Sequence, residues 1–439
     1  MNKKYSIVLT FIFLFNIVFP FNILIAKDVY DPLSGGWLEE QDGVNILHVS
    51  GSYYEMGYQH GYLLKNEILE NIRCRNDTLS RHGWPIEKRK DVWNIQKQYL
   101  PQEYLEEING MADGSGLSID EIAVHNMWIG VFNLMSCWGA ALWGDATVDG
   151  TLYHMRSCDG SFDVKDPLSG KTLNENTFLM VRQPDNAYDS LYPFYAGDIV
   201  CIGGFNEKGV AVGELTIHCS DTQFHGINSG FRMRMVIDYA DDIYYASEIM
   251  NSNRTCGWNF IISDGNIPTG FAIEQSANYV YTGAWFDPTE SMIPFWEIKD
   301  VVRRGNCYIH PILAKNERKN YDCSGIKGFF QWMFKKDIYF VPWTQYKAIS
   351  EEIEQQYGSL TLEKTMMLFR EVYSGHTNLI FRFMQNHDYY ASRHLWVACP
   401  KSGDMAICFG DDVKKSYENP IHYFNLFELM NSEPPPSLI

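Results

Sequence analysis

Cys137 is the residue of this chain whose surroundings best fit covalent chemistry. It opens an alternating apolar segment with turn signals at 144–145 and 149–150. This pattern predicts two strands folded back on each other. Arg156 and Asp159 then fall where the second strand ends, close to Cys137. A thiolate is the reactive form of cysteine, and a neighbouring guanidinium favours it over the thiol.

The arrangement predicts cleavage of the chain between Ser136 and Cys137. The thiol attacks the preceding carbonyl, the acyl group moves to sulfur, and water releases the upstream chain. The new α-amine of Cys137 then serves as its base. We expect Arg156 to lower the thiol pKa from its usual value of about 8.5, and Asp159 to orient the amine. The structural alternatives are a buried small cysteine and a salt bridge at a strand end, with Cys158 as a rival nucleophile.

Several segments of the chain occur in the order that one known family shows. The chain resembles the acyl-coenzyme A:6-aminopenicillanate (isopenicillin-N) acyltransferase-like peptidase family, a cysteine branch of the N-terminal-nucleophile hydrolases that includes bile salt hydrolases and acid amidases. The resemblance implies an α+β fold, a four-layer αββα sandwich, and a small α chain that stays associated after cleavage. The six segments are 46–61, 110–121, 204–213, 258–264, 271–274 and 395–398.

The chain departs from this family at several positions near the expected site. Relatives often have an aromatic residue after the Arg-x-x-Asp element, where this chain has Gly160. Thr216 stands where bile salt hydrolases have an asparagine that holds the oxyanion, and Gln345 stands in place of an arginine. Asn306 keeps an asparagine of the family. We therefore expect Asn306 to stabilise the oxyanion, with Thr216 as the second candidate.

Capping and strand patterns predict where the elements lie. The segment 27–136 is expected to be mainly helical after one early strand, with Ser-x-x-Glu capping boxes at Ser52 and Ser118. Gly57 and Gly61 would share one face of the first helix and allow close packing, and Thr361 caps a late helix. The strands expected after Cys137 are 152–155, 177–182, 210–217, 259–262 and 270–273.

The ends of the chain suggest export and a division into segments. Residues 1–26 have the three parts of a secretory signal peptide, with a retained membrane anchor as the alternative. Residues 27–136 form the expected α chain, 137–430 the catalytic β chain, and 431–439 a disordered tail. The aromatic segment 329–343 either lines an acyl pocket or packs into the core.

The charge and cysteine content of the chain limit the classes of partner and metal that it can be expected to bind. A formal net charge of −18 argues against nucleic acid or an anionic membrane surface as a partner. Ten cysteines permit disulfides in an exported protein, but their connectivity cannot be read from the sequence. The chain has no Cys-x-x-Cys, and His154 with Cys158 is a poor zinc signal. We expect neither metal nor cofactor.

Together these features predict an exported, self-processed amidohydrolase that cleaves a carbon–nitrogen amide outside the peptide main chain. Its expected partners are a small N-acyl substrate and its own α chain. Hydrolysis is favoured over acyl transfer because an exported enzyme meets no coenzyme A. The alternatives are an acyltransferase, an ester-cleaving relative, and a binding protein that kept the fold and lost catalysis.

Overall fold

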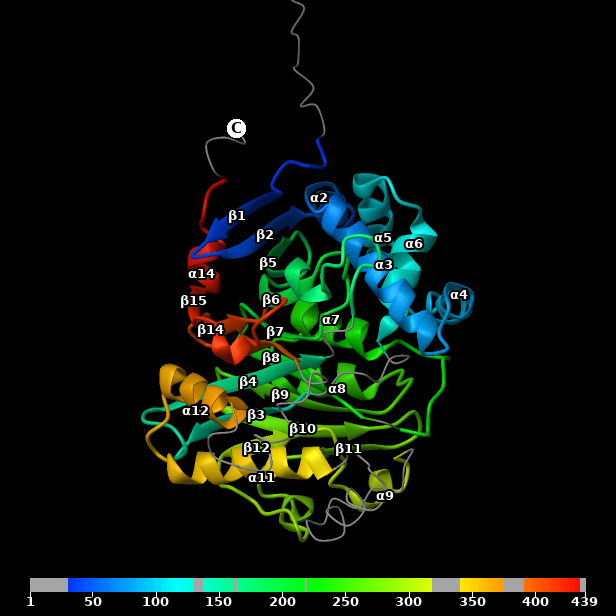
Figure 1. Cartoon of the computed structure of the whole chain (residues 1–439). Helices are drawn as coiled ribbons and strands as arrows, with labels where there is room; N and C mark the ends of the chain where they lie inside the picture. The colour runs from blue at the N-terminus through cyan, green and yellow to red at the C-terminus, as the bar shows by residue number, and fades with distance from the viewer. Residues whose placement is uncertain are drawn as a thin grey trace, which may run out of the picture. The chain divides into compact units, whose positions relative to one another are not determined.

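The computed structural model describes residues 31–129, 137–160, 164–217, 219–317, 340–374 and 391–434. The chain divides into two units, Met1–Pro32 and Leu33–Ile439, and every element below belongs to the second (Figure 1). In the described ranges, no helix is long and apolar enough to cross a membrane. The predicted signal segment, the loop before the predicted cleavage, most of the aromatic segment and the end of the tail lie outside the described residues.

The larger sheet has nine strands in the order β1-β2-β5-β6-β7-β8-β9-β10-β11. Its neighbours are antiparallel except for β2 and β5, which are parallel. Where one early strand was predicted the structure has two, joined at Asp42 and Gly43, whose φ values of 53° and 83° suit a tight hairpin turn. The first was missed because it is a short, partly exposed edge strand without apolar alternation. The strands are β1 (Trp37–Gln41), β2 (Val44–Gly51), β5 (Thr177–Pro184), β6 (Ser190–Tyr195), β7 (Gly203–Asn206), β8 (Val210–Thr216), β9 (Trp258–Asp264), β10 (Thr269–Gln275) and β11 (Val280–Gly283).

The smaller sheet has six strands in the order β12-β3-β4-β13-β14-β15. Its β3–β4 hairpin confirms the predicted pair of strands, and Arg156 lies opposite Gly139, close to where β3 begins. Cys137 is therefore held just before a buried strand rather than within it. The strands are β3 (Gly139–Gly144), β4 (Gly150–Gly160), β12 (Val301–Arg304), β13 (Ala391–Cys399), β14 (Asp404–Phe409) and β15 (His422–Asn425).

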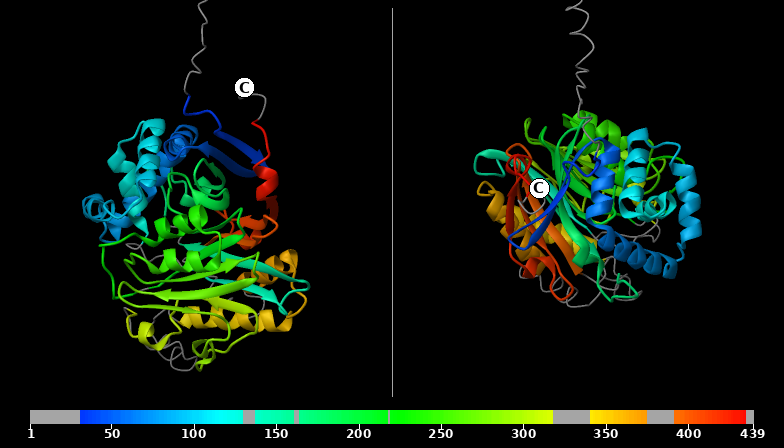
Figure 2. Two further views of the ribbon diagram at one scale, coloured as in Figure 1. Left: turned by 180° about the vertical axis from the view of Figure 1, so that it is seen from behind. Right: turned by 90° about the horizontal axis from the view of Figure 1, so that it is seen from above.

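The two sheets pack face to face. Strands β3, β4 and β12 contact β8, β9 and β10, and most side chains on both sides of these strands are buried. Helices α7 (Ser229–Tyr239) and α8 (Ile243–Asn251) pack on the larger sheet, and α12 (Leu362–Ser374), itself against α11 (Phe340–Gln355), packs on the smaller sheet. The view from above in Figure 2 places the C-terminal strands, in orange and red, on the opposite side from the N-terminal helices, in blue and cyan. The observed class is α+β.

The N-terminal segment forms a helical group beside the larger sheet. Both predicted capping boxes are confirmed, at Ser52 and Ser118. The first helix breaks at Leu64, and its Gly57 and Gly61 meet α5 so closely that an added Cβ would lie 2.1 Å and 2.4 Å from backbone oxygens. These helices are α2 (Tyr53–Leu63), α3 (Lys65–Arg81), α4 (Ile86–Gln96), α5 (Gln102–Ser115), α6 (Ile119–His125) and η1 (Asn126–Trp128). The remaining short helices are η2 (Leu173–Asn176), η3 (Pro288–Ser291), α9 (Pro311–Ala314), η4 (Ser416–Glu418) and α14 (Leu426–Leu429).

Candidate active site

Cys137 lies between the two sheets at the start of the β3–β4 hairpin. Its side chain is fully buried. Arg156, from the facing strand, points one guanidinium nitrogen at the thiol, with Nη2 3.5 Å from Sγ. The hairpin thus brings together the two residues that the sequence paired, because Arg156 lies at a register position near the first strand's beginning.

Glu214 completes this cluster and was missed by the sequence analysis. Its Oε1 accepts a hydrogen bond from Arg156 Nη2 at 2.8 Å and lies 3.7 Å from Cys137 Sγ, which donates to it. Glu214 comes from β8 of the other sheet, so its approach depends on the packing of the two sheets. The available signal was one acidic residue inside an otherwise apolar strand that is buried throughout.

Burial controls the protonation of this cluster. It raises the pKa of the Cys137 thiol well above its usual range, with Glu214 adding to the effect and Arg156 opposing it. Burial also raises the pKa of Glu214 to about 7, again against Arg156. Arg156 therefore acts in the predicted direction without overcoming desolvation. Cys137 in the uncut chain is a protonated thiol beside a carboxylate that titrates near neutrality.

Asn306 holds the backbone of Cys137 and a strand of the other sheet together. Its Oδ1 accepts from the Cys137 backbone N–H at 3.0 Å, and its Nδ2 donates to the backbone oxygen of Thr216 at 2.7 Å. The Thr216 hydroxyl is buried and has no hydrogen-bond partner among the described residues. Asn306 thus contacts the nucleophile directly, Thr216 is joined to it only through Asn306, and one hydrogen of the Asn306 amide is already used.

Asp159 is close to the site, but in the part of the chain that the structure describes no hydrogen bond joins it to the Cys137 amide. Its Oδ2 accepts from the Ser157 hydroxyl at 3.4 Å, and Ser157 in turn binds the backbone of Trp138. Burial raises the pKa of the Asp159 carboxyl. In the uncut chain, the hydrogen bond that orients the Cys137 nitrogen comes from Asn306.

Cys158 follows Arg156 by two residues along β4, so its side chain is on the same face of the strand. Its Sγ is 3.4 Å from the Tyr195 hydroxyl, and the register of the smaller sheet sets it opposite His394. The other residue that departed from the family pattern, Gln345, lies buried on α11, and none of the described contacts joins it to Cys137. No group of three or more His, Cys, Asp or Glu side chains among the described residues could hold a metal ion.

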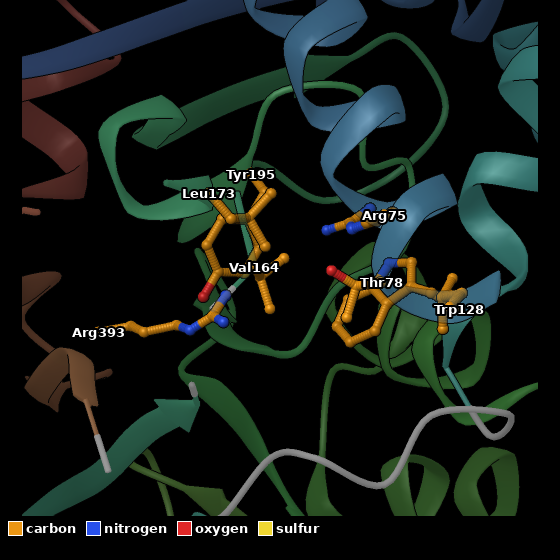
Figure 3. Close-up of a pocket in the computed structure, with 8 residues that line it drawn as sticks. Arg75, Thr78, Trp128, Val164, Leu173, Tyr195 and Arg393 are labelled. Carbon is orange, nitrogen blue, oxygen red and sulfur yellow. The ribbon is translucent and has the colours of Figure 1, made fainter. Parts of the chain in front are cut away.

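A pocket adjoins the site through Tyr195 (Figure 3). Its wall combines two arginines, Arg75 and Arg393, with aromatic and aliphatic side chains. Arg75 is paired with Asp198, its Nη2 2.7 Å from Oδ2, and lies over the Trp128 ring. Such a lining combines an apolar surface with two buried charged groups. The lining residues are Arg75, Thr78, Leu79, Trp128, Val164, Leu173, Tyr195 and Arg393.

Comparisons with known proteins give sequence relatives but no family. No protein-family model matches the chain. An uncharacterised protein of Archaeoglobus fulgidus is 24% identical over 366 residues, 74% of this chain and 57% of that protein. Two Dictyostelium discoideum proteins also match, dcd1B (22% over 268 residues, 55% and 52%) and dcd1A (23% over 282 residues, 57% and 63%). The chain thus spans less than two thirds of the length of these curated relatives.

Among solved structures, the chain is similar to two forms of the conjugated bile acid hydrolase from Clostridium perfringens and to an acid amidase. The hydrolase forms give TM-scores of 0.37 and 0.40 at 14% and 12% identity, each over 66% of this chain and 93% of the other. The Caenorhabditis elegans ortholog of N-acylethanolamine-hydrolyzing acid amidase gives 0.36 at 13% identity, over 60% and 93%. At these TM-scores the likeness says nothing about activity, which has to be read from the residues at the site.

Proposed function

We propose that this protein is a cysteine N-terminal-nucleophile amidohydrolase. It cuts its own chain before Cys137 and then hydrolyses the linear amide of a small N-acyl compound. The packing of helices on both outer faces of the two sheets supports the four-layer αββα sandwich of such enzymes. Export through the segment 1–26 belongs to the same proposal.

One observation carries the proposal: the Cys137 thiol touches Arg156 and Glu214 while Asn306 holds its backbone nitrogen. A structural cysteine needs only apolar contact. A nucleophile needs a proton acceptor and an oriented backbone, and Cys137 has both.

Self-cleavage begins with the proton of the Cys137 thiol. Glu214 takes it up as sulfur attacks the carbonyl carbon of Ser136, because Oε1 is within reach of Sγ and its pKa lies near neutrality. The peptide nitrogen leaves with a proton, which gives a thioester and the free α-amine of Cys137. Water then hydrolyses the thioester and releases the upstream chain as a carboxylic acid.

Turnover reuses the same atoms with the amine as base. The α-amine accepts the thiol proton, sulfur attacks the substrate amide, and the proton passes to the leaving amine. Thr216 and the second hydrogen of the Asn306 amide face the developing oxyanion. Asp159 and Asn306 orient the new amine. Water completes the cycle by releasing the acid.

The test combines chain masses with a substrate panel. The purified protein is expected to contain a chain that begins at Cys137 and to release free acid from N-acyl amino acids, penicillins or bile-salt conjugates without an added acyl acceptor. Cys137→Ala is expected to stay uncut and inactive. Cys408→Ala, a buried thiol elsewhere in the smaller sheet, serves as the matched control and is expected to be cut normally.

Two results would change the assignment. Strict dependence on a coenzyme A thioester would make the protein an acyltransferase. If the chain stays intact and hydrolyses no member of the panel, the result favours a binding protein on the same fold.

A further inference from the structure

Cys137, Cys158 and His394 form a row across three neighbouring strands of the smaller sheet. The register of β3 and β4 pairs Gly139 with Arg156, and the Ser157 backbone N–H donates to the Trp138 oxygen at 2.9 Å. Continued by one residue, this pairing sets Cys137 opposite Cys158. Side chains directly opposite in an antiparallel pair share a face of the sheet. The two thiols accordingly interact with each other.

The backbone at this point has the geometry that a disulfide between neighbouring strands requires. The Ser157 N–H donates to the Trp138 oxygen, as at a hydrogen-bonded position, while the Trp138 N–H donates to the Ser157 hydroxyl at 3.1 Å. Cys137 and Cys158 accordingly fall at the next, non-hydrogen-bonded position. At such a position of a regular antiparallel pair the Cα atoms lie about 4.5 Å apart, the closer of the two spacings. Disulfides span Cα distances of about 4.4 to 6.8 Å. The bond could therefore form without a change in strand pairing.

The surroundings of the pair favour one thiolate. Arg156 Nη2 lies 3.5 Å from the Cys137 sulfur, and the Tyr195 hydroxyl lies 3.4 Å from that of Cys158. Burial opposes ionisation of Cys158, but its contact with Cys137 and the nearby His394 and Arg156 outweigh burial and lower its pKa. Cys158 therefore ionises readily, whereas the Cys137 thiol keeps its proton.

Three other buried cysteines lack this environment. Nine cysteines are described, and all are buried. Burial raises the pKa of Cys74, Cys201 and Cys408 to about 12 each. A thiol that stays protonated is inert toward oxidants.

We propose that Cys137 and Cys158 form an oxidative modification site, at which a hydroperoxide converts the two thiols into a disulfide and reversibly removes the nucleophile. Cys158, the thiol that ionises more readily, is oxidised first, and Cys137 is the resolving thiol of this pair. Access to the sulfur rests on the proposed function. Hydrogen peroxide must enter through the opening that admits the amide substrate, and it is the smaller of the two molecules.

The chemistry balances in two steps. The Cys158 thiolate attacks one peroxide oxygen, so that a sulfur–oxygen bond forms, the oxygen–oxygen bond breaks, and the departing hydroxide takes up the proton of the Cys137 thiol and becomes water. The Cys137 thiolate left by this proton transfer then attacks the sulfenic sulfur of Cys158, the sulfur–sulfur bond forms, and a second hydroxide leaves and takes up a proton from solvent to become water. Each sulfur gives up one electron and the peroxide is reduced to two waters. A small dithiol reverses the reaction by exchange.

The experiment treats the full, purified chain with hydrogen peroxide and maps its thiols by mass spectrometry. Arg156 lies between the two cysteines, so trypsin separates them and only a disulfide joins their peptides. The wild type is expected to lose the mass of two hydrogen atoms and to regain it with dithiothreitol. Cys137→Ser, which lacks the resolving thiol, is expected to carry Cys158 as sulfinic acid, which dithiothreitol does not restore. Cys408→Ser, the matched control, is expected to form the link as the wild type does.

The mass map is read without any activity assay. If peroxide leaves both cysteines of the wild type open to alkylation, or drives Cys158 to sulfinic acid without a linked peptide, the modification site is refuted, whether or not the protein hydrolyses amides. A linked peptide in a chain that cleaves no amide would uphold the site and count against the proposed function alone.

Discussion

Two buried carboxylates of this protein, Asp238 and Glu214, both face arginine, yet their surroundings differ. Asp238 Oδ1 accepts from Arg182 at 2.8 Å and from Arg234 at 3.1 Å, and Oδ2 accepts from two tyrosine hydroxyls. Both oxygens are fully used. Glu214 has one arginine and a thiol on Oε1, and its Oε2 has no partner among the described residues.

The difference appears in the proton affinity of the two groups. Burial alone would raise the pKa of Asp238, but Arg234 and Arg182 outweigh it and lower the pKa. For Glu214, burial prevails over Arg156 and brings the pKa to about 7. A saturated carboxylate holds the fold together. A half-satisfied one can exchange a proton at neutral pH, as a general base must.

The largest expected effect comes from exchanging each carboxylate for its amide. Glu214→Gln removes the proton acceptor and is expected to slow self-cleavage by roughly 10²- to 10⁴-fold. Asp238→Asn leaves Arg182 and Arg234 under-compensated in the core and is expected to lower the free energy of unfolding by about 3–5 kcal/mol. Cleavage rates from chain masses and urea denaturation of both variants measure the two effects.

The contrast between Glu214 and Asp238 is refuted if either variant lacks its expected effect. A Glu214→Gln chain that cuts itself at the normal rate would return Glu214 to a structural role. An Asp238→Asn chain that is as stable as the wild type would show that the saturated network adds nothing.

A second, smaller effect is expected at the oxyanion. Asn306→Ala should lower turnover by about a hundredfold, since a preorganised donor contributes roughly 2.7 to 4 kcal/mol. Thr216→Val should be milder, and Thr216→Ser, which keeps the hydroxyl, milder still. Thermal unfolding of the same variants separates a role of Asn306 in holding the oxyanion from its role in tying the Cys137 backbone to β8. Near-normal turnover in a folded, processed Asn306→Ala enzyme would exclude it as an oxyanion donor.

The sequence itself predicted the local part of this site, the family resemblance added Asn306 and Thr216, and Glu214 was missed. Cys137 and Arg156 share one hairpin, whose turn signals and alternation are visible in the chain itself. Glu214 reaches the thiol from the other sheet, and His394 reaches Cys158 from β13, far along the chain. No periodicity specifies how two sheets stack. The contacts of Glu214 and His394 therefore needed the structure.

A third effect concerns the thiol itself. Arg156→Ala should shift the reaction of Cys137 with iodoacetamide to higher pH, because the thiolate loses its neighbouring charge. The shift is limited because the substitution also removes the positive charge beside Glu214. The Glu214 carboxylate then protonates more easily, so less negative charge opposes the thiolate. Arg156→Lys, which keeps a charge, should shift less. Arg182→Ala, in the saturated network, should leave the profile unchanged, and a profile equally unchanged in Arg156→Ala would remove Arg156 from the site.

The smallest expected effect is a difference in how stability depends on pH. The pKa of Glu214 is about 7 in the folded chain and 4.5 in its ordinary state. A raised pKa means that the folded chain binds the proton more tightly, so this group stabilises the fold below pH 4.5 and the contribution is lost as pH rises through about 7. Glu214→Gln has no such proton. The stability of the wild type minus that of Glu214→Gln should therefore fall between pH 4.5 and 7 and level off above.

Asp238 supplies the matched control for this slope. Its pKa is lowered in the folded chain, so its contribution is fully present above its ordinary value of 3.8 and is lost only as pH falls through the lower, folded value. The stability of the wild type minus that of Asp238→Asn should thus stay flat over the range in which the Glu214 difference falls. Urea denaturation at four pH values between 4.5 and 8 measures both curves. If the two difference curves run parallel, the folded chain treats the two carboxylates alike. The distinction between the saturated Asp238 and the half-satisfied Glu214 would then be refuted.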